Sequence, residues 1–190
     1  YIYNTLYTFW EKRNIKLDFI EDKSLIYNKH TSRNTTYICF DTNTFIKKSY
    51  KHEYKTLIKL KDIDEVIDVL NYNVHINDDG EKDYYITMPY LYGWKRLNEY
   101  KGDSISIIKI FIKICEGLQK IHNMDVLHCD IKPANIMVSP DEDIVFIDFE
   151  ETGGTSGYIA PEVIYNKFNE SIYTRAVDIW SLGMTMFNVY

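Results

Sequence analysis

The sequence predicts an α+β fold in two consecutive parts, an antiparallel sheet with one helix followed by a mostly helical part. Short β-prone runs separated by turn residues fill the first half of the 190 residues. After Gly93 the apolar residues change to a helical spacing. We place the boundary near Leu91 to Trp94, so that residues 1–91 form the first part and residues 92–190 form the second.

In the first part we expect five strands and one helix. The strands are predicted at 19–27, 36–41, 44–49, 66–76 and 82–91, and the turn at Asp79-Gly80 joins the last two. Residues 50–61 are predicted to be helical, because Tyr54, Leu57, Ile58 and Lys61 recur at helical spacing. This pattern is typical of an antiparallel sheet that packs against one helix.

In the second part we expect two long helices with short strands between them. Residues 104–122 form the first helix, with Ser104 as its N-cap. Its predicted apolar face consists of Ile107, Ile108, Phe111, Ile114, Cys115, Leu118 and Ile121. Small strands are predicted at 126–127, 136–138 and 144–147, and the apolar stretch 177–190 is predicted to be a buried helix.

Composition excludes several classes of protein. The formal net charge is −6 and the sequence pI is about 5.4, which argues against a nucleic-acid or anionic-membrane surface. The three cysteines, Cys39, Cys115 and Cys129, show no CxxC spacing, so we expect neither a zinc site nor a disulfide framework. The sequence contains no run of 18 apolar residues. We therefore predict a cytoplasmic protein, in the host cytoplasm if the source is a virus or a parasite.

The strongest chemical signal is the polar string His128-Cys129-Asp130-Ile131-Lys132-Pro133-Ala134-Asn135 between two apolar runs. Asp148 follows 13 residues after Asn135, within Ile147-Asp148-Phe149. Phosphoryl transfer needs a carboxylate that orients the incoming hydroxyl, a cation near the γ-phosphate and oxygen ligands for magnesium. The string and Asp148 contain each of these parts, so the sequence indicates a phosphotransferase.

Four ordered motifs resemble those of protein kinases. Residues 128–135 resemble the catalytic loop H-R-D-L-K-P-E-N, and 148–150 resemble D-F-G. Residues 154–162 look like G-T-x-x-Y-x-A-P-E, and 178–183 look like D-x-W-S-x-G. The chain thus resembles eukaryotic-type protein kinases over residues 19–190. The resemblance implies a bilobal kinase-like fold, an ATP and Mg²⁺ requirement, and a protein substrate.

The resemblance also implies roles for the residues around the catalytic loop. Asp130 would accept the proton of the substrate hydroxyl, and Lys132 would steady the γ-phosphate. Asn135 and Asp148 would hold magnesium. Lys132, together with Thr155 in the G-T-x-x-Y segment, is typical of the Ser/Thr class.

Further roles fall in the first part of the chain. Lys47 lies where the strand lysine of V-A-I-K is expected and would pair with the α/β-phosphates. Glu53 would be its helix partner, with Glu65 as the alternative. The competing interpretation is a solvated strand lysine for Lys47 and a solvated helix carboxylate for Glu53. Residues 87–93 are similar to the family's hinge. There Met88 would be the gatekeeper, and Pro89 and Leu91 would bind adenine through their backbone groups.

Three departures from the family pattern bear on activity. The glycine-rich phosphate loop is missing, since no glycine occurs between Phe19 and Cys39. Cys129 replaces the arginine of H-R-D, and Glu150 replaces the glycine of D-F-G. The glycine-poor loop beside Phe45-Ile46-Lys47-Lys48 also resembles FIKK kinases.

The family normally adds further helices after residue 190, so we expect a truncated or minimal kinase. Its final helix would then expose an apolar patch, covered by self-association or by a partner. That patch would consist of Trp180, Leu182, Met184, Met186 and Phe187.

Three functions are compatible with these residues. The leading interpretation is an active Ser/Thr protein kinase, because Lys47, Asp130, Lys132, Asn135 and Asp148 are all present. The alternative is a pseudokinase that serves as a binding or scaffold module. A phosphotransferase acting on a small molecule is the third, and the kinase-like segment 153–162 argues against it.

Overall fold

The computed structural model describes residues 26–30, 35–39, 44–76, 79–165 and 172–190. These residues form two compact units. The first contains the described residues up to Tyr50 together with Leu70–Tyr90, and the second contains Lys51–Val69 and Leu91–Tyr190. The first unit is an antiparallel sheet and the second is mainly helical, which confirms the predicted α+β fold.

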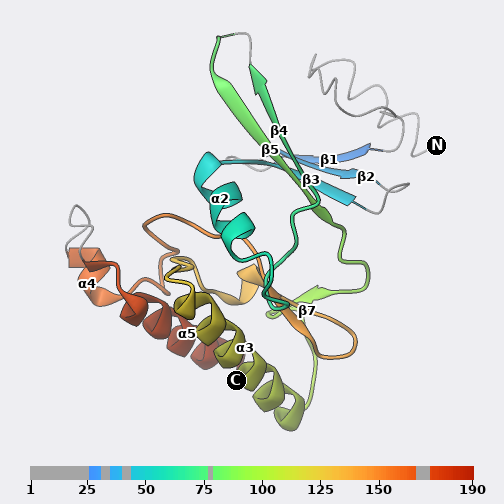
Figure 1. Ribbon diagram of the computed structural model, residues 1–190. Coiled ribbons are helices and arrows are strands. Elements are labelled where there is room, and N and C mark those ends of the chain that lie inside the picture. Colours follow the sequence, from blue (N-terminus) through green and yellow to red (C-terminus); the bar gives the residue numbers. More distant parts are fainter. Residues whose placement is uncertain (1–25, 31–34, 40–43, 77–78, 166–171) are drawn as a thin grey trace. The chain divides into compact units, whose positions relative to one another are not determined.

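The first unit is one five-stranded sheet in the order β1-β2-β3-β5-β4, with every neighbouring pair antiparallel (Figure 1). Its strands are β1 (Ile26–His30), β2 (Thr35–Cys39), β3 (Thr44–Ser49), β4 (Asn71–Ile76) and β5 (Lys82–Pro89). The central pair β3–β5 places Lys47 opposite Ile86 and Phe45 opposite Met88. The sheet therefore holds the strand lysine and the predicted gatekeeper in one fixed register.

Two of the predicted strands, 19–27 and 66–76, do not coincide with described strands over their full length. Most of the predicted strand 19–27 lies outside the described residues. The predicted strand 66–76 begins only at Asn71, because the residues before it bond elsewhere. Val66 forms an isolated parallel bridge with Phe146, and Ile67 donates its N–H to the Phe146 carbonyl at 3.2 Å.

Helix α2 (Lys51–Lys59) follows β3 directly and groups with the second unit. Its buried side chains include Glu53, Thr56 and Leu57, while Ile58 is 40% exposed. The predicted helix is therefore present, but its buried face is rotated away from Ile58. Glu53, the predicted helix carboxylate, is thus a buried residue in the first turn of this helix.

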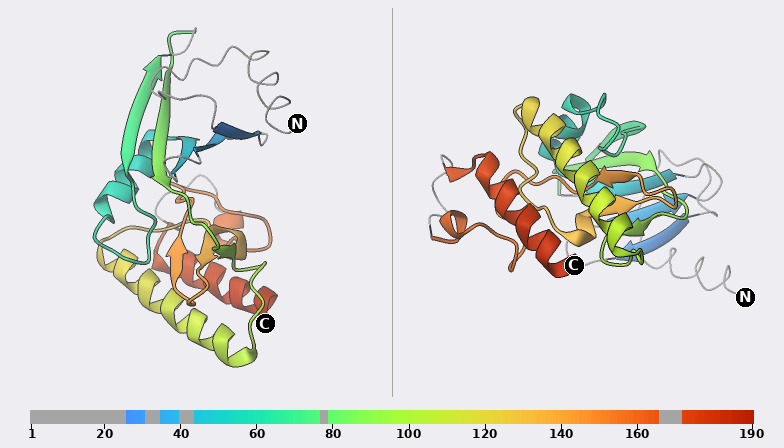
Figure 2. Two further views of the ribbon diagram at one scale, coloured as in Figure 1. Left: turned by 90° about the vertical axis from the view of Figure 1, so that its right-hand side faces the viewer. Right: turned by 90° about the horizontal axis from the view of Figure 1, so that it is seen from below.

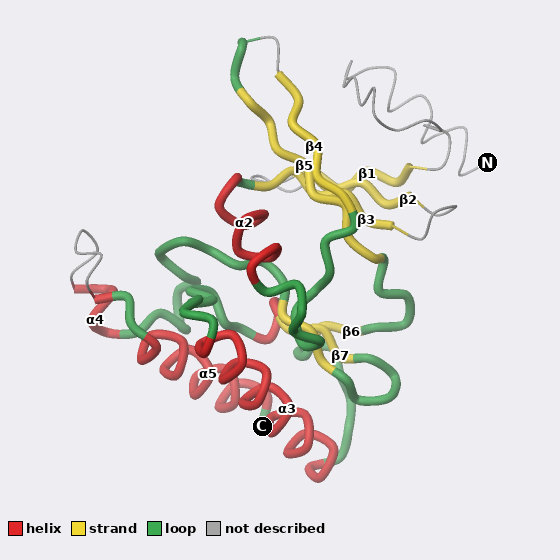
Figure 3. Tube along the Cα trace, in the orientation of Figure 1, coloured by secondary structure: helices red, strands yellow, loops and turns green. Residues whose placement is uncertain are grey.

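The second unit combines helices with a small antiparallel sheet in the order β6-β7-β8 (Figure 3). Its elements are β6 (Lys95–Arg96), α3 (Ser104–Asn123), the 3-10 turn η2 (Pro133–Asn135), β7 (Ile136–Val138), β8 (Ile144–Phe146), α4 (Pro161–Tyr165) and α5 (Arg175–Val189). The strands predicted at 136–138 and 144–147 are present. The one predicted at 126–127 is wrong, because the chain turns at Asp125 with φ 51°.

Helix α3 supplies much of the core of this unit, and Figure 2 shows its full length beside the small sheet. Its buried residues are Ile110, Phe111, Ile114, Gly117, Leu118, Ile121 and His122. The predicted face was partly wrong, since Ile108 is 47% exposed and Cys115 is exposed. The N-cap is Asp103 rather than Ser104, because the Asp103 carboxylate accepts the Ser106 N–H at 2.8 Å.

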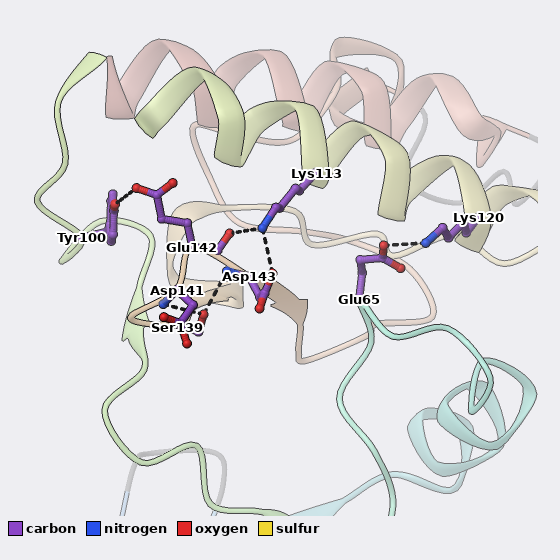
Figure 4. A network of polar contacts seen from close by, with 8 residues as sticks. All are labelled: Glu65, Tyr100, Lys113, Lys120, Ser139, Asp141, Glu142 and Asp143. Carbon is purple, nitrogen blue, oxygen red and sulfur yellow. Dashed lines mark hydrogen bonds and ion pairs between the residues drawn. The ribbon is translucent and has the colours of Figure 1, made fainter. Parts of the chain in front are cut away.

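Polar contacts tie α3 to two neighbouring segments (Figure 4). Lys113 donates to the Asp143 carboxylate at 2.7 Å and to the Glu142 carbonyl at 2.8 Å, so it holds the turn between β7 and β8. Seven residues along the helix, Lys120 donates to Glu65 at 2.5 Å. The Lys113 contacts thus hold the turn of the β7–β8 hairpin, whose open end carries Asn135 and Asp148.

Helix α5 was predicted to be buried, and this is wrong for part of its surface. Val177, Asp178, Ser181 and Thr185 are buried. Three members of the predicted patch are exposed, Trp180 at 45%, Met186 at 45% and Phe187 at 79%, whereas Leu182 and Met184 are half-buried. The helix is therefore amphipathic in this chain.

None of the helices in the described part of the chain combines the length and the apolar character that a membrane span requires.

Gly117 provides a test of how tightly α3 packs. A Cβ at this position would lie 2.8 Å from the Glu65 Cβ and 3.1 Å from the Phe146 ring. Glu65 cannot easily retreat, since its carbonyl accepts the Phe146 N–H at 2.8 Å. We expect overpacking in Gly117→Ala to cost about 2 kcal/mol. Helix propensity returns about 1 kcal/mol, so the free energy of unfolding should fall by a net amount of about 1 kcal/mol.

The matched control is Gly183→Ala in α5, where a Cβ would meet no atom within 4 Å. Only the propensity gain applies there, so stability should be unchanged or slightly higher. Urea unfolding of both variants measures the difference. Equal effects at the two positions would contradict the close approach of α3 to Glu65.

Candidate functional site

One buried carboxylate on α5 anchors residues 128–135, which are called the catalytic loop below. Asp178 is 0% exposed, and its two oxygens accept the backbone N–H groups of His128 and Cys129, each at 2.9 Å. His122 of α3 lies against the same carboxylate, with 2.7 Å between Nε2 and Oδ2. Both oxygens of the buried anion thus have hydrogen-bond partners, one on Oδ1 and two on Oδ2. The motif around Asp178 was identified from the sequence, but its role as anchor of the loop, and His122 altogether, were missed.

His128 connects the catalytic loop to the segment that contains Asp148. Its Nδ1 accepts the Asp130 N–H at 3.3 Å, and its Nε2 lies 3.1 Å from the Ile147 carbonyl. This pattern assigns the proton to Nε2 of a neutral ring. The ring stacks on Phe149 with centroids 4.4 Å apart. Burial lowers the pKa of His128, although Asp178, Asp130 and Asp148 oppose that shift.

Asp130 lies at the centre of a polar cluster of four residues. Its Oδ1 accepts the Thr155 hydroxyl at 2.7 Å, and its Oδ2 accepts Lys132 Nζ at 2.5 Å and Asn135 Nδ2 at 2.8 Å. Lys132 also donates to the Thr155 hydroxyl oxygen at 2.6 Å. Asn135 Nδ2 donates a second time, to the Asp130 carbonyl at 2.9 Å. The structure therefore brings three of the predicted site residues into direct contact, together with Thr155.

The β7–β8 hairpin brings Asn135 and Asp148 to the same end of the small sheet. Ile136 pairs with Phe146, and the Ile147 N–H donates to the Asn135 carbonyl at 3.0 Å. Asp148 follows immediately, with a left-handed φ of 61°. Since Asn135 Nδ2 donates to Asp130, its amide oxygen is directed away from that carboxylate. Among the described residues, no cluster of three or more His, Cys, Asp or Glu side chains could hold a metal ion.

The remaining predicted residues are placed within their own units. In the first unit, Lys47 is 8% exposed and Met88 is 4% exposed. In the second unit, Glu53 is 4% exposed. Burial excludes the interpretation of Lys47 and Glu53 as solvated side chains. Pro89 ends β5 and Leu91 follows it; both are half-buried.

The alternative carboxylate, Glu65, is engaged elsewhere. Its Oε1 accepts Lys120 of α3 at 2.5 Å, and its side chain is 19% exposed. This ion pair raises the pKa of Lys120. Glu65 therefore serves to attach α3 to the segment between α2 and β4, and Glu53 remains the preferred candidate.

Gly154 allows the segment after Asp148 to approach the catalytic loop. Its φ is 120°, and a Cβ there would lie 3.0 Å from the Cys129 carbonyl oxygen. Only glycine fits both the backbone conformation and the space. The next residue is Thr155, so this close approach delivers its hydroxyl to Asp130. Sequence reasoning used Thr155 for the substrate class and missed its bond to Asp130.

Cys129 occupies the position of the arginine in H-R-D as a buried, neutral thiol. Its side chain is 7% exposed, and burial raises its pKa to about 12. Its φ is 61°, a left-handed conformation that is uncommon for residues other than glycine. The Cys129 side chain therefore supplies no positive charge. The backbone N–H of Cys129 does contribute, because it donates to Asp178.

The anchor predicts a large effect of removing one charge. In Asp178→Asn one carboxylate oxygen becomes an amide donor, so one buried backbone N–H loses its acceptor. We expect the free energy of unfolding to fall by about 1.5–3 kcal/mol, measured by urea denaturation. The control is Asp125→Asn, whose side chain is 86% exposed and should leave stability unchanged. Wild-type stability in Asp178→Asn would show that the loop does not depend on this carboxylate.

A second prediction concerns pH. Because the pKa of His128 is lowered in the folded state, the unfolded chain binds the extra proton more readily. The contribution of neutral His128 should be complete above the unfolded pKa of about 6.5 and should be lost as the pH falls below it. His128→Phe keeps the stacking but cannot titrate, so its stability should fall less steeply with acid. Parallel pH curves for the two proteins, from thermal or urea unfolding, would contradict this.

Comparisons with known proteins agree with this geometry. The protein kinase domain family matches residues 25–190. Mitogen-activated protein kinase 12 of Mus musculus is 32% identical over 162 residues, which are 77% of this chain and 42% of the relative. Mitogen-activated protein kinase pmk-1 of Caenorhabditis elegans is 34% identical over 136 residues, 65% of this chain and 34% of the relative.

Mitosis inhibitor protein kinase SWE1 of Candida albicans is 37% identical over 102 residues, which are 47% of this chain and 8% of the relative. The chain thus spans less than half of the length of each of these three relatives. They do not support the further resemblance to FIKK kinases. The match over residues 25–190, together with the ordered motifs, shows that the chain belongs to the eukaryotic-type protein kinase family.

Proposed function

We propose that this chain is the catalytic core of an active Ser/Thr protein kinase, which transfers the γ-phosphate of ATP to protein hydroxyls. The observation that carries the proposal is the cluster around Asp130. Its carboxylate is bonded to a lysine, an amide and a hydroxyl, all within 2.8 Å. This is the set of contacts expected around a carboxylate that orients an attacking hydroxyl beside a transferring phosphoryl group.

In this proposal each residue of the cluster has a separate task. Asp130 accepts the proton of the substrate hydroxyl as the oxygen attacks phosphorus. Lys132 Nζ lies within 2.6 Å of both the Asp130 carboxylate and the Thr155 hydroxyl. Its positive charge can therefore stabilise the negative charge of a phosphoryl group that is transferred to a hydroxyl at this place. His128 positions Asp130, because its Nδ1 accepts the Asp130 N–H.

Asn135 and Asp148 are proposed to hold Mg²⁺. Carboxylate and amide oxygens are the ligands that this ion prefers, and the two residues share the open end of the β7–β8 hairpin. The orientation of the Asn135 amide fits this role, because its nitrogen is already used by Asp130. A Mg²⁺ ion held by these two residues would supply positive charge that offsets the charge of the nucleotide phosphates.

Nucleotide binding is proposed for the residues that match the family pattern upstream of the catalytic loop. Lys47 is assigned to the α/β-phosphates, with Glu53 as its partner, because both are buried charged residues at positions that match the family pattern. Met88, Pro89 and Leu91 are assigned to adenine. Lys132 and Thr155 support the Ser/Thr class rather than tyrosine specificity. Protein substrates and a cytoplasmic location belong to the same proposal.

The second candidate is a pseudokinase that acts as a scaffold. Two features favour it, the absence of glycine between Phe19 and Cys39 and the exposed carboxylate of Glu150 next to Phe149. Side chains in a phosphate loop obstruct the approach of backbone N–H groups to phosphate. A scaffold, however, has no need for the Asp130 cluster together with Asn135 and Asp148.

Phosphate transfer from labelled ATP to casein, with magnesium and the complete protein, separates these functions. We expect Asp130→Asn and Asp148→Asn each to lose transfer by about 10²- to 10⁴-fold, because one removes the proton acceptor and the other a metal ligand. Asp125→Asn serves as the exposed control and should retain wild-type transfer. Folded wild-type protein that transfers no phosphate would favour the pseudokinase, and transfer that survives in Asp130→Asn would contradict the assigned role of Asp130.

A further inference from the structure

The hydroxyl of Thr155 already has the contacts that the proposed mechanism assigns to a substrate hydroxyl. It donates to Asp130 Oδ1 at 2.7 Å and accepts from Lys132 Nζ at 2.6 Å. Asp130 is the proposed proton acceptor, and Lys132 is the proposed cation at the transferred phosphoryl group. A hydroxyl bonded to both groups lies where an acceptor must lie before it attacks phosphorus.

We propose that Thr155 is itself a phosphate acceptor, modified by its own chain, and that this modification limits the activity of the site. The inference rests on the proposed kinase function. In the step, a bond forms between Thr155 Oγ1 and the γ-phosphorus of ATP. The bond from that phosphorus to the β–γ bridging oxygen breaks, and ADP leaves with its electron pair. The hydroxyl proton passes to the Asp130 carboxylate.

The backbone around Thr155 holds its hydroxyl next to Asp130. Gly154, with φ 120°, approaches the Cys129 carbonyl and keeps the segment close to the catalytic loop. On the N-terminal side, the Gly153 N–H donates to the Tyr173 hydroxyl at 2.9 Å. On the C-terminal side, the Thr155 carbonyl accepts the N–H groups of Tyr158 at 2.9 Å and Ile159 at 3.2 Å. The fold of the chain itself thus positions this hydroxyl beside the proposed proton acceptor, which supports an intramolecular step.

The same contacts explain why the modification would be self-limiting. A phosphate carries a charge of about −1.5 to −2 at neutral pH. Attached to Thr155, it would lie beside the Asp130 carboxylate and would take up Lys132 as its counter-ion. The hydroxyl that now bonds to Asp130 would be lost, and the acceptor position would be filled. Transfer to protein substrates should therefore decrease as the modification accumulates.

Intact-protein and peptide mass spectrometry after incubation with ATP and magnesium tests this inference. We expect one phosphate at position 155 in wild-type protein and in Thr155→Ser, which keeps a hydroxyl there. Thr155→Val should carry none at that position. Ser156→Ala is the neighbouring control, because Ser156 is exposed, and it should be modified at Thr155 like wild type. Casein phosphorylation by preincubated protein should fall in proportion to the phosphate found at Thr155.

The intramolecular route is tested by mixing. Wild-type protein incubated with Asp130→Asn should leave Thr155 of that variant unmodified, and the rate per chain should not change with protein concentration. Phosphate on Thr155 of Asp130→Asn would overturn the intramolecular route, and casein transfer that rises with the modification would overturn the limiting role.

The outcomes also separate this inference from the function on which it rests. Wild-type protein that phosphorylates casein while position 155 stays unmodified would overturn the inference alone, and would leave Thr155 as a positioning residue. Absence of transfer to both casein and Thr155 would overturn the proposed function and this inference with it.

Discussion

The buried carboxylate of Asp178 is the interaction on which the rest of the site depends. A charge removed from water is stable only when its hydrogen-bonding capacity is filled, and here adjacent backbone N–H groups and a histidine fill it. Those N–H groups belong to His128 and Cys129, immediately before Asp130. The position of Asp130 is therefore set by a residue 48 positions later in the sequence. Helix α5 thus holds the loop that carries Asp130 and contributes Asp178 only as its anchor.

A second constraint comes from the β7–β8 hairpin. The strands are only three residues long, so their pairing alone is weak support. Lys113 of α3 holds the turn at one end, and at the other end Asn135 and Ile147 bond through their backbones. The two proposed metal ligands are thus fixed by a helix that carries neither of them. Gly117 serves the same arrangement, because it lets α3 lie close to Glu65 and Phe146.

Local signals explain what could be predicted from the sequence. The strand at 44–49 follows from a β-prone run between turn residues, and the helix beginning at Ser104 follows from apolar spacing. The residues of the catalytic loop follow from their order. The contact of Thr155 with Asp130 could not be predicted, because it depends on a left-handed glycine and a close approach across 25 residues. The burial of Glu53 and the partial burial of Leu182 and Met184 likewise depend on which neighbours the fold supplies. The spacing of apolar residues identifies the apolar face of a helix, but it does not show which other parts of the chain pack against that face.

The environment of Cys129 has a consequence for chemical labelling. A thiol with a pKa of about 12 forms almost no thiolate at neutral pH, and little of its surface reaches solvent. Cys115 on α3 is exposed, so a maleimide or disulfide reagent can reach it in the folded protein. We therefore expect labelling of Cys129 to require opening of the catalytic loop that buries it. The labelling rate of this sulfur would then report how often the loop opens, without any introduced probe.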